Sequence, residues 1–112
     1  MKTTLTPSSF GADVSPGRCV VVEVSGELDL AGAPVLEAAV GDLELSTARE
    51  VVLDLRRLVF IDAAGLRAVL HLYAECLRDT VILTIIPGPR SVHRVFELTR
   101  LDHLLTFSHP LT

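Results

Sequence analysis

Aromatic side chains are scarce in this sequence: its 112 residues contain four Phe, one Tyr and no Trp. Proteins that bind single-stranded nucleic acid stack its bases on aromatic rings, and this chain has few rings to offer. Its formal net charge is −4, whereas a surface that binds the phosphate backbone is rich in Lys and Arg. We therefore expect no nucleic-acid partner.

Long hydrophobic runs, blocks of like charge and a secretory leader are also missing. No apolar run approaches the roughly 20 residues that cross a bilayer, and no charge block predicts a membrane-surface patch. The first residues, MKTTLTPSSFGADV, lack the apolar centre of a secretory signal. These absences predict a cytoplasmic protein with no direct membrane insertion.

Two cysteines are present, Cys19 and Cys76, and they form no CxxC pair. In a cytosolic chain we expect both to be small buried hydrophobic residues. A redox pair would require the fold to bring them together, which the sequence does not show.

What the chain does contain is an alternation of strand and helix patterns. Hydrophobic residues make up 49% of it, enough for one core, and we expect a single domain over 1–112 with a weakly defined N-terminal segment, 1–18. The expected strands are a short edge strand within 3–14, then 19–26, 51–55, 81–87 and a last one at 103–107, and the expected helices are 34–45, 63–78 and 90–99. This order predicts an α/β fold with a mixed, mostly parallel sheet of four to five strands and about three helices. The first two strands are expected to form an antiparallel hairpin across the turn at 15–18.

The stretch VFIDAAGLRAVL, residues 59–70, joins the end of a buried strand to the start of helix 63–78. Asp62 is placed to cap that helix, because its carboxylate can accept hydrogen bonds from the free N–H groups of the first turn. Helical spacing assigns one face to the core and the other to solvent. The expected core positions are Leu66, Val69, Leu70, Tyr73 and Leu77, and the expected outer positions are Arg67, His71, Glu75 and Arg78.

Catalytic and metal chemistry find little support. Asp29, Asp54 and Asp62 each follow or end a strand and could share one edge of the sheet, where paired carboxylates can do acid–base work. Capping of a helix by Asp62 and ordering of a loop by Asp29 explain these two residues better than catalysis does. The sequence shows no nucleophile with a general base positioned beside it. His71 and Glu75 lie one helical turn apart, but two ligands do not make a zinc site. We expect no enzyme activity, no metal and no cofactor.

The start of helix 63–78 is a place where a phosphorylated serine could act as a binding switch. Unpaired N–H groups give a helix N-terminus partial positive charge, which accommodates a phosphate that still presents its charge to a docked partner. Ala64 stands where such a serine would be useful, and it has no hydroxyl.

Three segments together resemble the STAS domain family, and within it the stand-alone bacterial anti-sigma factor antagonists. They are GELDLAGAPVLEAAV (26–40), VVLDLRRLVFIDAAGLRAVL (51–70) and ILTIIPGPRSVHRVFELTRLDHLL (82–105), which cover most of the chain in the family's order. The resemblance implies a non-enzymatic domain that binds an anti-sigma factor with an ATPase-type kinase fold and so frees a sigma factor.

The resemblance also implies roles for residues at the junction. In the family, the partner kinase phosphorylates a serine just before a Gly-Leu pair, and this ends the binding. By the motif, that serine corresponds to Ala64, directly ahead of Gly65 and Leu66. Asp62 and Asp29 match the family's motif aspartate and loop aspartate.

The chain departs from the family at two points. Ala63 and Ala64 stand where serines are usual, so the standard switch cannot operate, and the chain stops at Thr112, short of the usual C-terminal helix. We therefore expect a STAS-like domain that lacks this helix. It is either an antagonist that stays permanently active, a STAS domain that docks another partner, or a chain engineered at residue 64.

The predicted partner-binding surface comprises the loop at Asp29, the junction, and outer positions of the helix that follows. Its residues are Asp29, Ile61, Asp62, Ala63, Ala64, Gly65, Leu66, Arg67, His71 and Glu75. A solvated face explains the last three equally well. An alternative function is that of a STAS accessory subunit of a membrane lipid-transport ATPase complex, which needs no phosphoserine. A small enzyme or ligand-binding domain is a weaker third class, and the sequence leaves a homodimer open.

Overall fold

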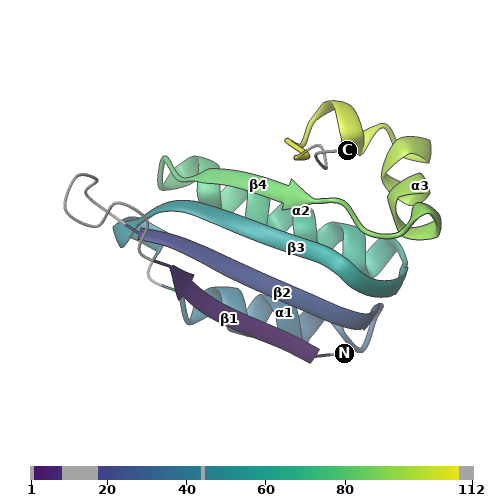
Figure 1. Ribbon diagram of the computed structural model, residues 1–112, viewed down its shortest axis with the longest axis horizontal. Helices are drawn as coiled ribbons and strands as arrows, with labels where there is room; N and C mark the ends of the chain where they lie inside the picture. The colour runs from purple at the N-terminus through teal and green to yellow at the C-terminus, as the bar shows by residue number, and fades with distance from the viewer. Residues whose placement is uncertain (1, 9–17, 44, 109–112) are drawn as a thin grey trace.

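The chain folds into one four-stranded sheet with two helices lying together on one of its faces (Figure 1). The computed structural model describes residues 2–8, 18–43 and 45–108, and among these the side chains of 2–8, 18 and 46 are not described. Along the chain the elements are β1 (Lys2–Ser8), β2 (Arg18–Leu28), α1 (Ala33–Gly41), the short helix η1 (Leu45–Thr47), β3 (Ala48–Ile61), α2 (Ala63–Arg78), β4 (Ile82–Ile86), α3 (Arg90–Leu98) and the short helix η2 (Leu101–His103).

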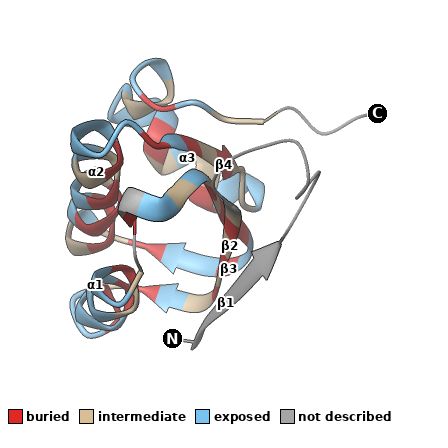
Figure 2. Ribbon diagram, turned by 90° about the vertical axis from the view of Figure 1, so that its left-hand side faces the viewer, coloured by how far each residue is buried: buried red, intermediate tan, exposed pale blue. Residues whose placement is uncertain are grey.

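The strands lie in the order β1-β2-β3-β4, with β1 antiparallel to β2 and the other neighbours parallel. This confirms the predicted mixed, mostly parallel sheet and the antiparallel pairing of the first two strands. Residues 15–17 of the predicted turn between them lie outside the described residues. Helices α1 and α2 are the crossovers that parallel neighbours require, and both lie on the same side of the sheet (Figure 2).

β3 is much longer than expected: it runs for 14 residues, where the sequence predicted a strand at 51–55. Its pairing with β2 contains three register shifts, and at each of them β3 carries one extra residue. Because of these bulges, every third residue after Leu55, namely Leu58 and Ile61, is buried instead of every second one. The strand therefore lacks the alternation by which sequence patterns reveal strands.

The core lies between the sheet and the two helices α1 and α2 (Figure 2). Its strand side chains are Val20, Val22, Val24 and Leu28 from β2, Val51, Leu53, Leu55, Leu58 and Ile61 from β3, and Leu83 and Ile85 from β4. These strand side chains are all aliphatic, and Phe96 of α3 adds a fully buried aromatic ring to the same core. Among the described residues, none of the helices has the length and apolar character needed to cross a membrane.

Helix α2 begins and ends where the sequence predicted, but the face that it buries is different. Leu66 and Val69 are buried as expected, whereas Leu70 and Tyr73 are only half-buried and Leu77 is exposed. The buried positions are Gly65, Leu66, Ala68, Val69, Leu72 and Cys76. The predicted stripe was wrong towards its C-terminal end because the buried face runs through Ala68, Leu72 and Cys76, and a hydrophobicity pattern discounts a small residue such as Ala68.

The segment after α3 does not form the strand predicted at 103–107. Arg100 has a positive φ of 62°, and the chain then winds into η2, where the Leu104 N–H donates to the Leu101 carbonyl at 3.1 Å. A single parallel bridge between Phe107 and Ile85 is what remains of the strand. Local helical hydrogen bonds thus take the backbone groups that a strand at 103–105 would have used.

The remaining differences are small. α1 ends at Gly41, earlier than the predicted residue 45, and α3 covers Arg90–Leu98 much as predicted. Cys76 is buried as expected, whereas Cys19 is only half-buried. Both are free thiols. Burial raises the pKa of the Cys76 thiol to about 11, which keeps it protonated and unreactive at neutral pH.

Candidate functional site

The ends of β2 and β3 meet at the start of α2 and form a junction between the sheet and the helix. Leu28 and Ile61 are the last paired residues of these strands, and the Asp62 N–H donates to the Leu28 carbonyl at 3.3 Å. The loop after β2 and the first turn of α2 are thereby held side by side. The sequence reasoning placed Asp29 and Asp62 at one edge of the sheet, and the structure confirms this for these two residues.

Both carboxylates at this edge organise backbone. Asp62 caps α2, because its Oδ1 accepts a hydrogen bond from the Gly65 N–H at 3.1 Å. Asp29 orders its own loop, where its Oδ1 accepts from the N–H groups of Ala31 at 3.1 Å and Gly32 at 2.8 Å. The predicted capping role of Asp62 and the loop-ordering role of Asp29 are confirmed.

Gly65 lies where the helix comes closest to the strand end. A Cβ at this position would overlap with the carbonyl oxygen of Leu28 and would lie 2.8 Å from Cγ1 of Ile61. Only a glycine therefore allows α2 to start this close to the sheet. Ile61, Gly65 and Leu66 are buried, so these three predicted contact residues shape the site from beneath its surface.

A groove runs between α1 and α2 on the outer side of the junction, with a volume of about 350 Å³. Its lining residues are Leu30, Ala33, Pro34, Glu37, Ala64, Arg67, Ala68 and His71. Three of the predicted site residues, Ala64, Arg67 and His71, thus come together on one groove. Ala64 is half-buried there, while Ala63 is exposed beside it.

His71 links the two helices that form this groove. Its Nδ1 lies 3.1 Å from Oε2 of Glu37 on α1, and its Nε2 lies 3.6 Å from Oε1 of Glu75, one turn on in α2. Within the described ranges, no set of three or more His, Cys, Asp or Glu side chains is arranged to hold a metal ion. His71 thus lies between a carboxylate of α1 and a carboxylate of α2, and its hydrogen bond with Glu37 ties the two helices together.

Sequence reasoning missed three exposed apolar side chains next to the junction. Leu30 is 74% exposed, and Val59 and Phe60, which directly precede Ile61 and Asp62, are 66% and 47% exposed. The sequence treated 59–61 as the end of a buried strand, and this was wrong for Val59 and Phe60 because the last bulge turns both outward. Exposed apolar side chains gathered at one end of a domain are typical of a protein-binding surface.

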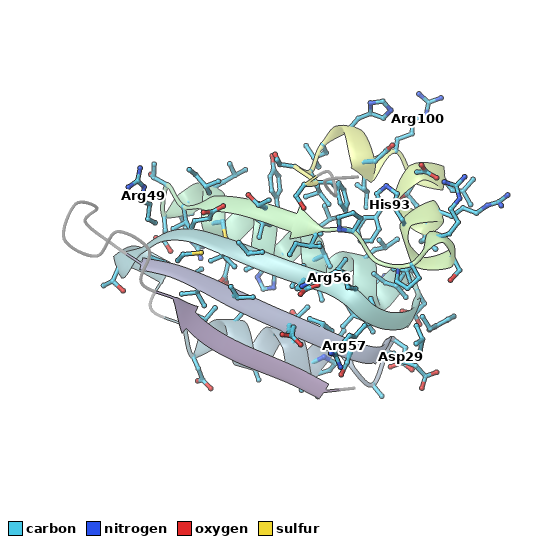
Figure 3. The ribbon with its side chains drawn as sticks, viewed as in Figure 1. Asp29, Arg49, Arg56, Arg57, His93 and Arg100 are labelled. Carbon is cyan, nitrogen blue, oxygen red and sulfur yellow. The ribbon has the colours of Figure 1, made fainter. Side chains whose placement is uncertain are left out.

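Asp54 lies apart from this junction. It pairs in register with Glu23 and Ile86 in the middle of the sheet, so the expectation that it shares the edge of Asp29 and Asp62 was wrong. Asp54 is 4% exposed. Arg56, which is labelled in Figure 3, donates hydrogen bonds to both of its carboxylate oxygens. The shortest of these runs from Nη2 to Oδ2 at 2.8 Å. These hydrogen bonds from Arg56 hold the pKa of the Asp54 carboxyl below its ordinary value.

This depressed pKa predicts a pH dependence of stability. At pH 7 we expect Asp54→Asn to lower the free energy of unfolding by about 1 kcal/mol, at the low end for charged hydrogen bonds because Arg56 faces solvent. The folded-state pKa lies below the unfolded one, so this stabilisation is present above the unfolded value and is lost as the pH falls through the folded value. Urea unfolding at pH 7, 5 and 3 measures it. The difference in the free energy of unfolding between the wild type and Asp54→Asn should be smaller at pH 3 than at pH 7, and a constant difference contradicts the prediction. Asp42→Asn, at an exposed carboxylate, is the control.

This fold and junction are those of a STAS domain. The family whose description reads "Mlab, STAS domain" matches residues 12–106, and the chain therefore belongs to the STAS domain family. An anti-sigma factor antagonist from Mycobacterium paratuberculosis is 25% identical with a TM-score of 0.76, over 98% of this chain and 88% of that one.

Two further solved structures share the fold. The phosphorylated form of the Bacillus cell fate determinant SpoIIAA is 18% identical with a TM-score of 0.64, over 95% of this chain and 92% of that one. A sulfate transporter family protein from Wolinella succinogenes is 22% identical with a TM-score of 0.64, over 80% of this chain and 75% of that one. At these identities the likeness is one of fold alone.

Proposed function

We propose that this protein is a non-enzymatic binding regulator of the anti-sigma factor antagonist type. It docks through the junction onto an anti-sigma factor with an ATPase-type kinase fold, and so frees a sigma factor. The observation that carries this proposal is the place of Ala64, half-buried on the first turn of α2 and lining a groove beside the exposed Leu30. The likeness to the antagonist from Mycobacterium paratuberculosis supports it.

The missing hydroxyl decides how such a regulator would be controlled. Ala63 and Ala64 occupy the first turn of α2, where a phosphorylated serine would add negative charge at the docking surface. With a methyl group at both positions, no phosphate can be attached there. The protein is therefore an antagonist that its partner kinase cannot switch off at this site.

A charge placed at residue 64 tests this proposal. Binding of the purified protein to each anti-sigma kinase of its own genome is measured with ATP present, for the wild type, Ala64→Asp and Ala64→Ser. Near a helix N-terminus an aspartate does not harm the helix, so loss of binding reports on the interface. We expect stable binding by the wild type and about 100-fold weaker binding by Ala64→Asp, since docking would bury an unpaired carboxylate. Ala64→Ser should bind first and then be released as the kinase phosphorylates it.

The matched control is Ala74→Asp, the same change at an exposed position of α2 away from the groove. Its affinity should equal that of the wild type, although a carboxylate late in a helix is less favourable for folding. Absence of wild-type binding to every kinase would overturn the proposal. So would an Ala64→Asp variant that binds like the wild type.

The same missing hydroxyl favours a second candidate. A STAS accessory subunit of a membrane lipid-transport ATPase complex binds its ATPase subunit without a phosphorylation switch, and Ala63 and Ala64 suit such a constant contact. Stable copurification with an ATPase subunit of that kind, together with no binding to any anti-sigma kinase, would select this candidate.

A further inference from the structure

The groove between α1 and α2 has a floor of very small side chains. Ala64 and Ala68 from α2 and Ala33 from α1 line it, and Ala33 and Ala68 are themselves buried. The hollow of about 350 Å³ exists because none of these positions carries a side chain beyond a methyl group. It is large enough to receive a leucine or phenylalanine side chain from another molecule.

The wall of the groove is apolar and already exposed. Leu30, at 74%, is the most exposed large hydrophobic residue among those the structure describes, and Pro34 on α1 is exposed beside it. Removing such surface from water is favourable in proportion to its area. An apolar side chain seated on the alanine floor would cover Leu30 and complete a hydrophobic contact.

The charges at the rim indicate what should stand next to that side chain. Glu37 and Glu75 both face His71. Arg67 is exposed and lines the groove, and within the described ranges no carboxylate lies within ion-pair distance of its guanidinium. The rim thus offers one cation to a partner, and a guanidinium pairs best with a carboxylate.

We infer that the groove binds a segment of the partner protein in which an apolar side chain enters over Ala64 and an adjacent Asp or Glu pairs with Arg67. This inference rests on the proposed function and names the chemistry that its docking surface selects. The occupant is a protein segment because most of the lining residues are solvent-exposed, which leaves the groove open along its side. Ala64 then has a positive role: its methyl group leaves room for the partner's side chain.

Two substitutions test the two halves of this inference separately. Ala64→Leu fills the groove without adding charge, and leucine is a good helix former, so the fold should be kept. Arg67→Glu reverses the rim charge and leaves the groove open. We expect each to weaken binding to the partner kinase at least tenfold, and Arg67→Lys, which keeps the charge, to weaken it less. An Asp or Glu of the partner changed to Lys should restore binding to Arg67→Glu.

The controls are Ala74→Leu on α2 and Arg94→Glu on α3, the same changes at exposed positions outside the groove. Both should bind like the wild type. If the wild type binds the kinase and neither Ala64→Leu nor Arg67→Glu alters the affinity, this inference is wrong while the proposed function stands. If the wild type binds no kinase, both fall. Self-association of the wild type that Ala64→Leu abolishes would assign the groove to a second copy and overturn the inference as well.

Discussion

Replacing Gly65 by alanine is expected to lower the free energy of unfolding by about 3 kcal/mol, the upper part of the range for overpacked sites. The added Cβ would overlap with the Leu28 carbonyl oxygen and would press against Ile61 from 2.8 Å. The Leu28 carbonyl cannot easily move, since it accepts from the Asp62 N–H and its residue is paired with Ile61. In an open helix the same change would be favourable by about 1 kcal/mol. The sign of the effect therefore reports the close approach of α2 to the end of β2.

Gly41→Ala is the matched control for this prediction. Gly41 is the last residue of α1, and a Cβ there would meet nothing within 4 Å. We expect it to be neutral or to stabilise by about 0.5 kcal/mol. Urea unfolding monitored by circular dichroism compares the two variants with the wild type. Equal effects of Gly65→Ala and Gly41→Ala would show that α2 moves away from the strand end at little cost.

The helix α2 is the element that the sequence predicted best, and the reasons are local. A capping aspartate at 62, two alanines and a long apolar pattern all act within the helix itself. The face that the helix buries was harder to predict, because burial depends on what packs against each position. Ala68 is buried and Leu77 is exposed, and a hydrophobicity pattern ranks them the other way round.

The strand β3 shows a second feature that the sequence did not predict, namely the register between neighbouring strands. Each of its three bulges depends on how β2 lies beside it, and no local pattern encodes that pairing. The same bulges turn Val59 and Phe60 outward, so the apolar surface next to the junction was missed together with the strand. The predicted strand at 51–55 ends beside the second bulge, which lies between Asp54 and Arg57.

The candidate site also combines local features, which the sequence predicted, with contacts between distant residues, which it did not. The roles of Asp29 and Asp62 follow from hydrogen bonds within three residues, and sequence reasoning predicted both. The contact between His71 and Glu37 joins residues 34 positions apart, and nothing near either residue predicts it. The groove also could not be predicted from local sequence, because α1 supplies one of its walls and α2 the other.

Phe96 should be among the most sensitive positions of the core, and we expect Phe96→Ala to lower the free energy of unfolding by about 4 kcal/mol. Its ring is 0% exposed on the inner face of α3 and makes an edge contact with the ring of Phe107, with the centroids 5.3 Å apart. Phe107 in turn belongs to the segment that covers the edge of β4, where the Ile85 N–H donates to Thr106 at 2.9 Å and the Ser108 N–H to Ile85 at 2.8 Å. Loss of the ring thus leaves a cavity and also removes the support that holds this segment on the sheet.

Leu98→Ala is the control, since Leu98 lies on the same helix and is 72% exposed. It should change stability by less than about 0.5 kcal/mol. Urea unfolding measures both variants, and amide hydrogen exchange at Ile85 separates the two contributions in Phe96→Ala. If the ring only fills space, exchange at Ile85 follows the global loss of stability. If the ring also holds the 106–108 segment in place, the Ile85 amide exchanges faster than the rest of β4, because its acceptor on Thr106 is freed first. A Phe96→Ala protein as stable as Leu98→Ala would contradict the assignment of Phe96 to the core.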